Sequence, residues 1–169
     1  MEFTCKTIYD QKTLTIMARA LRKTIRRSSS KKMRTLACFT AGISLLCLAG
    51  SLNKPWLAVG NGTIALLLIL LVWKEDACNA FFARQKGMPG SRECTTIFRS
   101  DCYESRIAGA LTQWQYSRIL LVAETSQYVV LVLGRNHAQA YDKTRLSGGT
   151  EESFRSFLKE KTGKAIEQI

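Results

Sequence analysis

One stretch of 38 residues, Leu36 to Trp73, constrains the fold of this chain more than any other, because Lys54 is its only charged residue. An Asn-Lys-Pro turn divides the stretch into two apolar runs, residues 36–53 and 55–73. A helix needs about 20 mostly apolar residues to cross a membrane, or about 17 at the least, so each run is just long enough. Because backbone polar groups inside a bilayer must be satisfied within the segment, each run should be a helix. We therefore expect a transmembrane helical hairpin over residues 36–73.

The ends of the second run agree with a membrane span. Pro55 can begin a helix without losing a needed hydrogen bond. Trp56 and Trp73 bracket the run where the two headgroup layers would lie, and indole rings are favoured there, so we predict that both are membrane-interface anchors. The alternative is a helical hairpin buried in a soluble protein. Soluble cores of this chain length seldom contain two adjacent uncharged runs this long.

The net charge of +12 could indicate a nucleic-acid partner, but its distribution argues against one. Residues 1–35 hold ten Lys or Arg against two acidic residues, whereas residues 93–169 hold ten against nine, so the C-terminal region is almost neutral. A basic excess beside an apolar span is instead the positive-inside signature. The turn between the runs carries only Lys54. We therefore predict a lipid bilayer as partner, no nucleic acid, and both termini in the cytoplasm.

Residues 1–35 are predicted to form a strand followed by a basic amphipathic helix. Residues 1–9 alternate in hydrophobicity, and Asp10 can cap a helix whose apolar residues recur at helical spacing. That helix either lies on the inner leaflet or packs its apolar stripe on the cytosolic domain, and both alternatives stay open. The run Ser28–Ser30 is expected to be a flexible joint. Seven cations are predicted to contact anionic lipid, namely Arg22, Lys23, Arg26, Arg27, Lys31, Lys32 and Arg34.

The chain after Trp73 changes from a linker to a strand pattern. Residues 74–92 are expected to be a juxtamembrane linker that begins as a short helix and ends at a Gly-Met-Pro-Gly segment. From residue 93 onward short alternating segments follow one another, which is typical of an antiparallel meander. The predicted strands cover residues 94–99, 102–108, 112–116, 117–124, 128–133 and 138–141. We also expect residues 1–9 to join this sheet, which would make the hairpin an insertion.

A helix is predicted to close the C-terminal domain. Thr150 can cap it, two glutamates suit its positive end, and Gly163 stops it. Phe154, Phe157 and Leu158 fall on one side and are expected to cover the sheet. The predicted fold class is therefore an α+β membrane protein, in which a two-helix transmembrane hairpin carries a small antiparallel PH-like β domain at residues 93–169.

Several segments between Ser100 and Lys161 carry a resemblance to a known family. They are S-D-C-Y-E, W-Q-Y-S-R-I, A-E-T-S-Q-Y, H-A-Q-A-Y-D-K and G-T-E-E-S-F-R-S-F-L-K-E-K. This part of the chain resembles the C-terminal domain of the YcxB-like family of bacterial membrane proteins, and the N-terminal layout is similar as well. The resemblance implies a cytoplasmic PH-like domain, over about residues 94–162, on a two-helix anchor in the bacterial cytoplasmic membrane. It implies no enzymatic activity, and relatives differ at Asp142-Lys143, so no site is expected there.

The residues themselves favour binding over catalysis. His137 is the only histidine and is placed in a predicted polar turn, and no Gly-rich loop followed by Lys and Ser or Thr is present to hold nucleotide phosphates. His137 also lacks neighbouring metal ligands at the usual spacing, so we expect neither a metal nor another cofactor. Two function classes remain. The chain is a membrane-anchored, non-enzymatic interaction or regulatory module with a protein partner, or a toxin-neutralising, immunity-type membrane protein.

Overall fold

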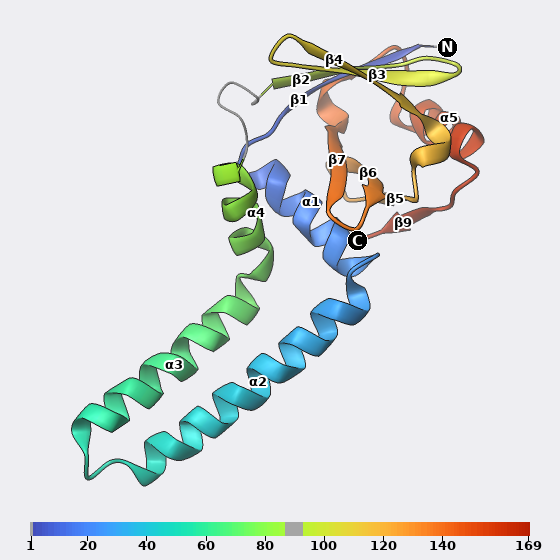
Figure 1. Cartoon of the computed structure of the whole chain (residues 1–169). Helices are drawn as coiled ribbons and strands as arrows, with labels where there is room; N and C mark the ends of the chain where they lie inside the picture. Colours follow the sequence, from blue (N-terminus) through green and yellow to red (C-terminus); the bar gives the residue numbers. More distant parts are fainter. Residues whose placement is uncertain (1, 87–92) are drawn as a thin grey trace.

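The computed structural model describes residues 2–86 and 93–169, which form five α-helices and two β-sheets. Two long helices project from a domain that holds the other elements (Figure 1). The helices are α1 (Gln11–Lys23), α2 (Arg27–Gly50), α3 (Pro55–Trp73), α4 (Glu75–Lys86) and α5 (Glu151–Thr162). The strands are β1 (Phe3–Ile8), β2 (Glu93–Phe98), β3 (Cys102–Ile107), β4 (Ala110–Gln115), β5 (Leu121–Glu124), β6 (Tyr128–Gly134), β7 (His137–Asp142), β8 (Leu146–Ser147) and β9 (Ile166–Gln168). The predicted end of the linker at residues 87–90 lies outside the described residues.

The first sheet joins the N-terminal strand to strands that follow the apolar stretch. Its strand order is β4-β3-β2-β1-β8, and β1 runs antiparallel to β2 with Phe3 opposite Phe98. The side chains of Phe3, Cys5 and Thr7 are buried, as the period-2 pattern of this segment predicts. The pairing confirms that residues before and after the apolar stretch share one sheet. The domain therefore begins at β1 and not at residue 93.

The second sheet has the order β7-β6-β5-β9. Strand β6 is apolar on both faces: Val129 and Leu131 contact the core between the sheets, while Val130 and Val132 contact α1. The predicted single meander is therefore wrong, because the strands divide into two sheets and β9 pairs in parallel with β5. The expected strand 117–124 is also interrupted, since Tyr116–Arg118 is a 3₁₀ turn before β5.

Aromatic side chains fill the space between the two sheets. The rings of Phe98 and Tyr141 are 5.0 Å apart and come from opposite sheets. Helix α5 adds Phe154, whose ring centroid lies 5.2 Å from that of Phe3 and 5.0 Å from that of Phe98. Thr150 caps α5 by accepting a hydrogen bond from the Ser153 amide. Its last residue is followed by a glycine in the left-handed conformation, so both predicted ends of this helix are confirmed.

Helix α1 packs on the outer face of the second sheet. Its Ala20 and Leu21 are buried against a cluster that includes Val130, Ala138 and Ala140. The Asp10 side chain accepts a hydrogen bond from the Thr13 amide at 2.8 Å, which confirms the predicted cap. Of the two alternatives for this helix, the structure therefore shows the one in which its apolar stripe contacts the domain. Helix α4 lies beside α1, so most of the predicted linker is a packed helix (Figure 1).

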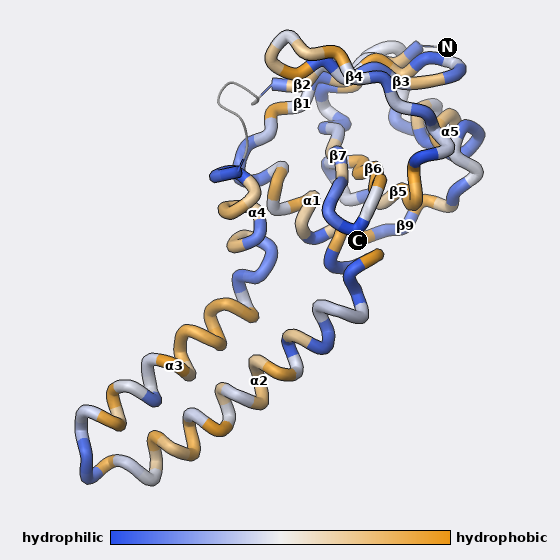
Figure 2. Tube along the Cα trace, in the orientation of Figure 1, coloured by the Kyte–Doolittle hydropathy of each residue, from blue (hydrophilic) through white to orange (hydrophobic). Residues whose placement is uncertain are grey.

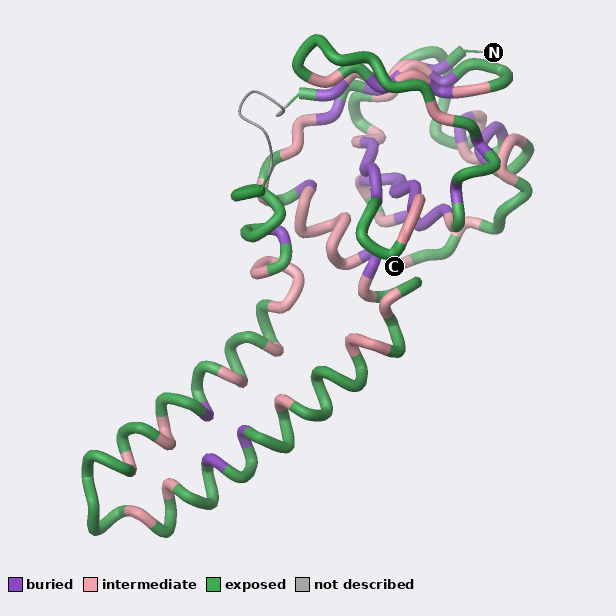
Figure 3. Tube along the Cα trace, in the orientation of Figure 1, coloured by how far each residue is buried: buried purple, intermediate pink, exposed green. Residues whose placement is uncertain are grey.

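Helices α2 and α3 run side by side away from the domain (Figure 1). Both are long and apolar enough to cross a membrane. In an apolar stretch of 18 residues within each helix, only 11% of the residues of α2 and 6% of those of α3 are buried. Figure 2 shows apolar residues along most of α3, and Figure 3 shows that the surfaces of both helices are largely exposed. Helix α2 begins at Arg27, nine residues before the predicted start at Leu36. The predicted joint at Ser28–Ser30 is therefore wrong, because no Gly or Pro interrupts the helix there.

Candidate functional site

The seven cations predicted to contact lipid lie at the junction between the domain and α2. Helix α1 ends at Lys23, and the backbone turns over Thr24–Arg26 before α2 begins. The Arg26 amide donates to the Leu21 carbonyl at 2.8 Å, which closes this turn without a glycine. The change of direction sends α2 out of the domain (Figure 1). The cations therefore gather where the two parts of the molecule meet.

Two of these seven cations, Arg22 and Arg26, make hydrogen bonds to other parts of the domain. Arg22 donates to both carboxylate oxygens of Asp76, at 2.6 and 2.7 Å, and these hydrogen bonds raise the pKa of its guanidinium. Asp76 belongs to α4, so this pair ties α1 to α4. Arg26 donates to the Arg135 carbonyl and to the Asn136 side chain in the turn between β6 and β7. Bidentate charged hydrogen bonds fix geometry, so both side chains act first as ties within the fold.

The other five cations are exposed and less engaged. Within residues 2–86 and 93–169, no carboxylate lies within ion-pair distance of Lys23, Arg27, Lys31 or Lys32. Arg34 is 3.9 Å from Glu75 and its side chain is 46% exposed, which makes that pair weak. A cavity of about 360 Å³ lies beside strand β9, and its basic lining residues are Arg22, Lys23, Arg27, Lys31 and Arg34. Five of the seven predicted cations thus surround one cavity.

The two predicted interface anchors lie at opposite ends of α3. Trp56 is 80% exposed and Trp73 is 72% exposed. At a rise of about 1.5 Å per residue, they are separated by about 26 Å along the helix axis, close to the thickness of a bilayer's hydrocarbon core. The Lys74 ammonium lies 4.5 Å from the centre of the Trp73 ring, in cation–π contact. This end of α3 is the one nearest the domain (Figure 1).

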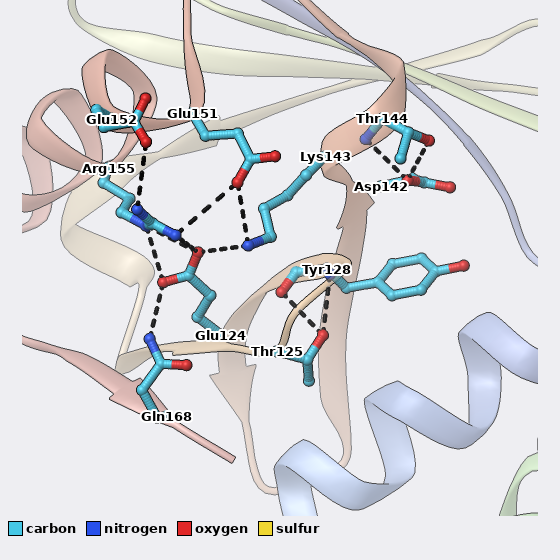
Figure 4. Close-up of polar contacts among 10 residues, drawn as sticks. All are labelled: Glu124, Thr125, Tyr128, Asp142, Lys143, Thr144, Glu151, Glu152, Arg155 and Gln168. Carbon is cyan, nitrogen blue, oxygen red and sulfur yellow. Dashed lines mark hydrogen bonds and ion pairs between the residues drawn. The ribbon is translucent and has the colours of Figure 1, made fainter.

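Phe154, Phe157 and Leu158, predicted to cover the sheet, all lie in the core between the two sheets. Sequence reasoning missed the polar network beside them, which Figure 4 shows. Its centre is Glu124 on β5, a carboxylate that is only 1% exposed. It accepts hydrogen bonds from Lys143 at 2.8 Å, from Arg155 at 2.8 Å and from Gln168 at 3.0 Å. Burial raises the pKa of Glu124, but these hydrogen bonds outweigh burial and hold its pKa below the ordinary value.

The Glu124 network links four elements of the domain. It joins β5, the 3₁₀ turn after β7, helix α5 and strand β9, and Glu151 lies 3.2 Å from the Lys143 ammonium. The charges of Glu124, Lys143 and Arg155 are therefore all paired. The network includes Lys143, at which the resemblance predicted no site. No sequence pattern could have found it, because its members are scattered between residues 124 and 168.

A second hollow lies at the end of the domain away from the Glu124 network. It has a volume of about 770 Å³, and its lining includes Asp101, Gln113, Trp114, Arg118, Leu133 and His137. The rings of Trp114 and His137 meet edge to face at 5.2 Å. Partial burial lowers the pKa of the His137 imidazole below its ordinary value. The predicted turn position of His137 is wrong, because His137 is the first residue of strand β7.

These arrangements offer binding surfaces. Among residues 2–86 and 93–169, no three His, Cys, Asp or Glu side chains are placed to hold a metal ion. All six cysteines are free thiols. The basic cavity has the chemistry of an anion site, while the hollow at Trp114 combines an aromatic ring with polar side chains. No protein-family model matches the chain, and the comparison with curated proteins gives no match.

Proposed function

We propose that the chain is a membrane-anchored, non-enzymatic interaction or regulatory module whose cytoplasmic domain binds a protein partner. The pairing of β1 with β2 carries this proposal. Because the domain is built from both flanks of α2 and α3, the two helices are an insertion whose ends are held together by the fold. Such an arrangement suits an anchor that fixes a domain at a membrane surface.

The surfaces of α2 and α3 support insertion in a bilayer. Large apolar side chains such as Leu46 and Val59 are 75% and 69% exposed, which would be costly in water. The cations gather at the domain end, and the turn at the other end carries only Lys54. By the positive-inside rule, the domain faces the cytoplasm and Lys54 the opposite side. A bacterial cytoplasmic membrane is the proposed location.

We also propose a PH-like fold and membership of the YcxB-like family. The two sheets closed by a C-terminal helix support a PH-like fold. Helix α1, which forms a further layer on the second sheet, and strand β9 are additions to the fold that was expected. The segments that carry the resemblance include Tyr116, Ile119, Tyr141 and Phe157, and all four are buried in the core. The resemblance therefore concerns residues that build the domain, so it supports architecture and leaves the partner open.

The hollow at Trp114 is the proposed contact surface for the partner. It adjoins β4, the edge strand of the first sheet, whose outer backbone groups have no strand partner in the described part of the chain. An edge strand can accept an added strand from another protein, and a neighbouring pocket gives such an interaction its specificity. Trp and Arg are also the side chains that contribute most to protein interfaces, and Trp114 and Arg118 line this hollow.

Photocrosslinking in cells tests this proposal. Benzoylphenylalanine placed at Gln113, which lines the hollow, should capture a discrete cytoplasmic protein. The matched control is Glu160 on α5, whose side chain is 72% exposed and which is not among the residues that line the hollow. Equal capture from both positions, or none from Gln113, would contradict the proposed surface.

The toxin-neutralising function is the second candidate, and the exposed apolar surface of α2 and α3 is the observation that favours it. In that case the helices bind a membrane-active effector directly. Leu66 on α3 is 57% exposed, so benzoylphenylalanine there should capture the effector while Gln113 captures nothing. The two proposals thus predict opposite crosslinking patterns.

A further inference from the structure

We infer that the junction between α1 and α2 binds one phospholipid with an anionic headgroup, taken from the leaflet on the domain side. The phosphate occupies the basic cavity, and an acyl chain lies in the groove between α2 and α3. This inference deepens the proposed function, because it rests on α2 and α3 lying in a membrane.

The first part of the argument is the basic cavity. Lys23, Arg27 and Lys31 line it without a carboxylate partner among the described residues, and Arg34 has only the 3.9 Å contact to Glu75. The opposing negative charge within the lining is Glu167 on β9 and the main-chain carboxylate of Ile169. Outside the lining, Asp76 already engages Arg22. The cavity therefore keeps an excess of positive charge. Guanidinium groups match phosphate oxygens in geometry, and ammonium groups add charge without a fixed direction.

The second part is an apolar groove that shares the lining residue Arg34 with the cavity. It has a volume of about 250 Å³ and lies between the domain-side halves of the two helices, where Ala37 and Ala41 face Leu68 and Val72. Small residues on α2 leave this space open, because a larger side chain at Ala37 would fill it. Trp73 lines the same groove at the level of the predicted headgroup layer.

The third part is the position of Arg34, which lines both the cavity and the groove. A ligand that occupies both must be anionic at one end and apolar at the other, with Arg34 at the boundary. A free phosphate would fill only the cavity, and a neutral lipid would leave the cations without a partner. The adjoining volumes, the charge and the surrounding bilayer all select an anionic phospholipid.

Lipid binding to the full chain in detergent, measured by native mass spectrometry, tests the inference. The probes are phosphatidylglycerol and phosphatidylcholine with identical acyl chains. We expect phosphatidylglycerol to bind at least tenfold more tightly. Each cation near an anionic surface contributes about a fivefold change in affinity, so the triple change Arg27→Gln, Lys31→Gln and Arg34→Gln should weaken phosphatidylglycerol binding by about 100-fold.

Matched variants separate the site from general charge and from misfolding. The triple change Arg145→Gln, Lys159→Gln and Lys164→Gln removes the same charge from exposed positions of the domain and should alter affinity by less than about threefold. Ala37→Phe should weaken binding of both lipids by filling the groove, whereas Thr40→Phe, at an exposed position one turn away, should not. Near-UV circular dichroism of each variant checks that the domain is folded.

Three results would overturn the inference: equal affinity for the two lipids, equal effects of the two triple changes, or glycerophosphate without acyl chains binding as tightly as phosphatidylglycerol. Failure of the proposed function itself has a different signature. If α2 and α3 do not insert in a membrane, a thiol at position 54 will not become accessible from the far side, whatever the lipid result.

Discussion

Removing the charge of Glu124 should destabilise the domain by about 3 kcal/mol. The change Glu124→Gln keeps the size of the side chain but leaves Lys143, whose side chain is 6% exposed, without its closest carboxylate. Breaking a buried ion pair by removing one partner costs about 3–5 kcal/mol. The lower end applies here, because Glu151 stays 3.2 Å from Lys143 and the Arg155 side chain is 38% exposed and can reach water.

Urea unfolding of the detergent-solubilised chain, followed by near-UV circular dichroism, measures this change. With a slope of about 2 kcal/mol per molar urea, the transition midpoint should fall by about 1.5 M. Glu152→Gln is the matched control, because Glu152 is 77% exposed and 3.9 Å from Arg155, so its loss should cost no more than about 0.5 kcal/mol.

The same pair of variants gives a pH test. The pKa of Glu124 lies below its ordinary value of 4.5 in the folded protein, so the charged carboxylate stabilises the fold above pH 4.5 and this contribution is lost as the pH falls through the folded pKa. The stability difference between wild type and Glu124→Gln should therefore shrink in acid. A cost below about 1 kcal/mol at pH 7, or a difference that grows in acid, would refute the account of this network.

Three further predictions concern the domain and use the same unfolding measurement or simple chemistry. Phe154→Ala should lower the free energy of unfolding by about 3–5 kcal/mol, because Phe154 is 2% exposed and lies among aromatic rings. Phe81→Ala should be nearly neutral, because Phe81 is 51% exposed, and similar costs for the two changes would show that α5 does not close the core. Gly148→Ala should cost about 2 kcal/mol, because Gly148 has a φ of +98° and a Cβ there would clash with the Glu2 carbonyl, while Ser147→Ala should cost less than about 1 kcal/mol. Burial raises the pKa of the Cys5 thiol to about 11, so N-ethylmaleimide at pH 7.5 should modify the half-buried Cys102 well before Cys5. Equal modification rates of the two thiols, measured by peptide mass spectrometry, would contradict the buried position of β1.

The elements with strong local signals could be predicted from the sequence. The alternation of residues 1–9, the two apolar runs, and the cap and stop of α5 each depend on neighbouring residues, and the structure has each of them in place. The pairing of β1 with β2 could also be anticipated, because alternating segments flank the two apolar runs on both sides and the two runs were expected to form a helical hairpin.

Features set by contacts between distant residues could not be predicted. The division into two sheets and the parallel pairing of β9 with β5 depend on how the aromatic core packs, which no local pattern encodes. The start of α2 was misplaced because the turn at Thr24–Arg26 contains neither Gly nor Pro. The candidate sites show the same limit. The cations of the basic cavity form a charge run that is visible in the sequence, whereas the apolar groove that Arg34 also lines requires α3 beside α2.

The central claim is that α2 and α3 cross a membrane as an anchor with the domain on the cytoplasmic side. Labelling with a membrane-impermeant maleimide in spheroplasts of a bacterial host tests it most directly, with Lys54→Cys compared with the wild-type chain. Both chains carry Cys47→Ser, because Cys47 is exposed near the end of α2 that adjoins Lys54. We predict that Lys54→Cys is labelled in intact spheroplasts, while the chain that is wild-type at position 54, whose half-buried Cys102 lies in the domain, is labelled only after lysis. Labelling of Lys54→Cys only after lysis, or labelling of the chain that is wild-type at position 54 in intact spheroplasts, would contradict the account.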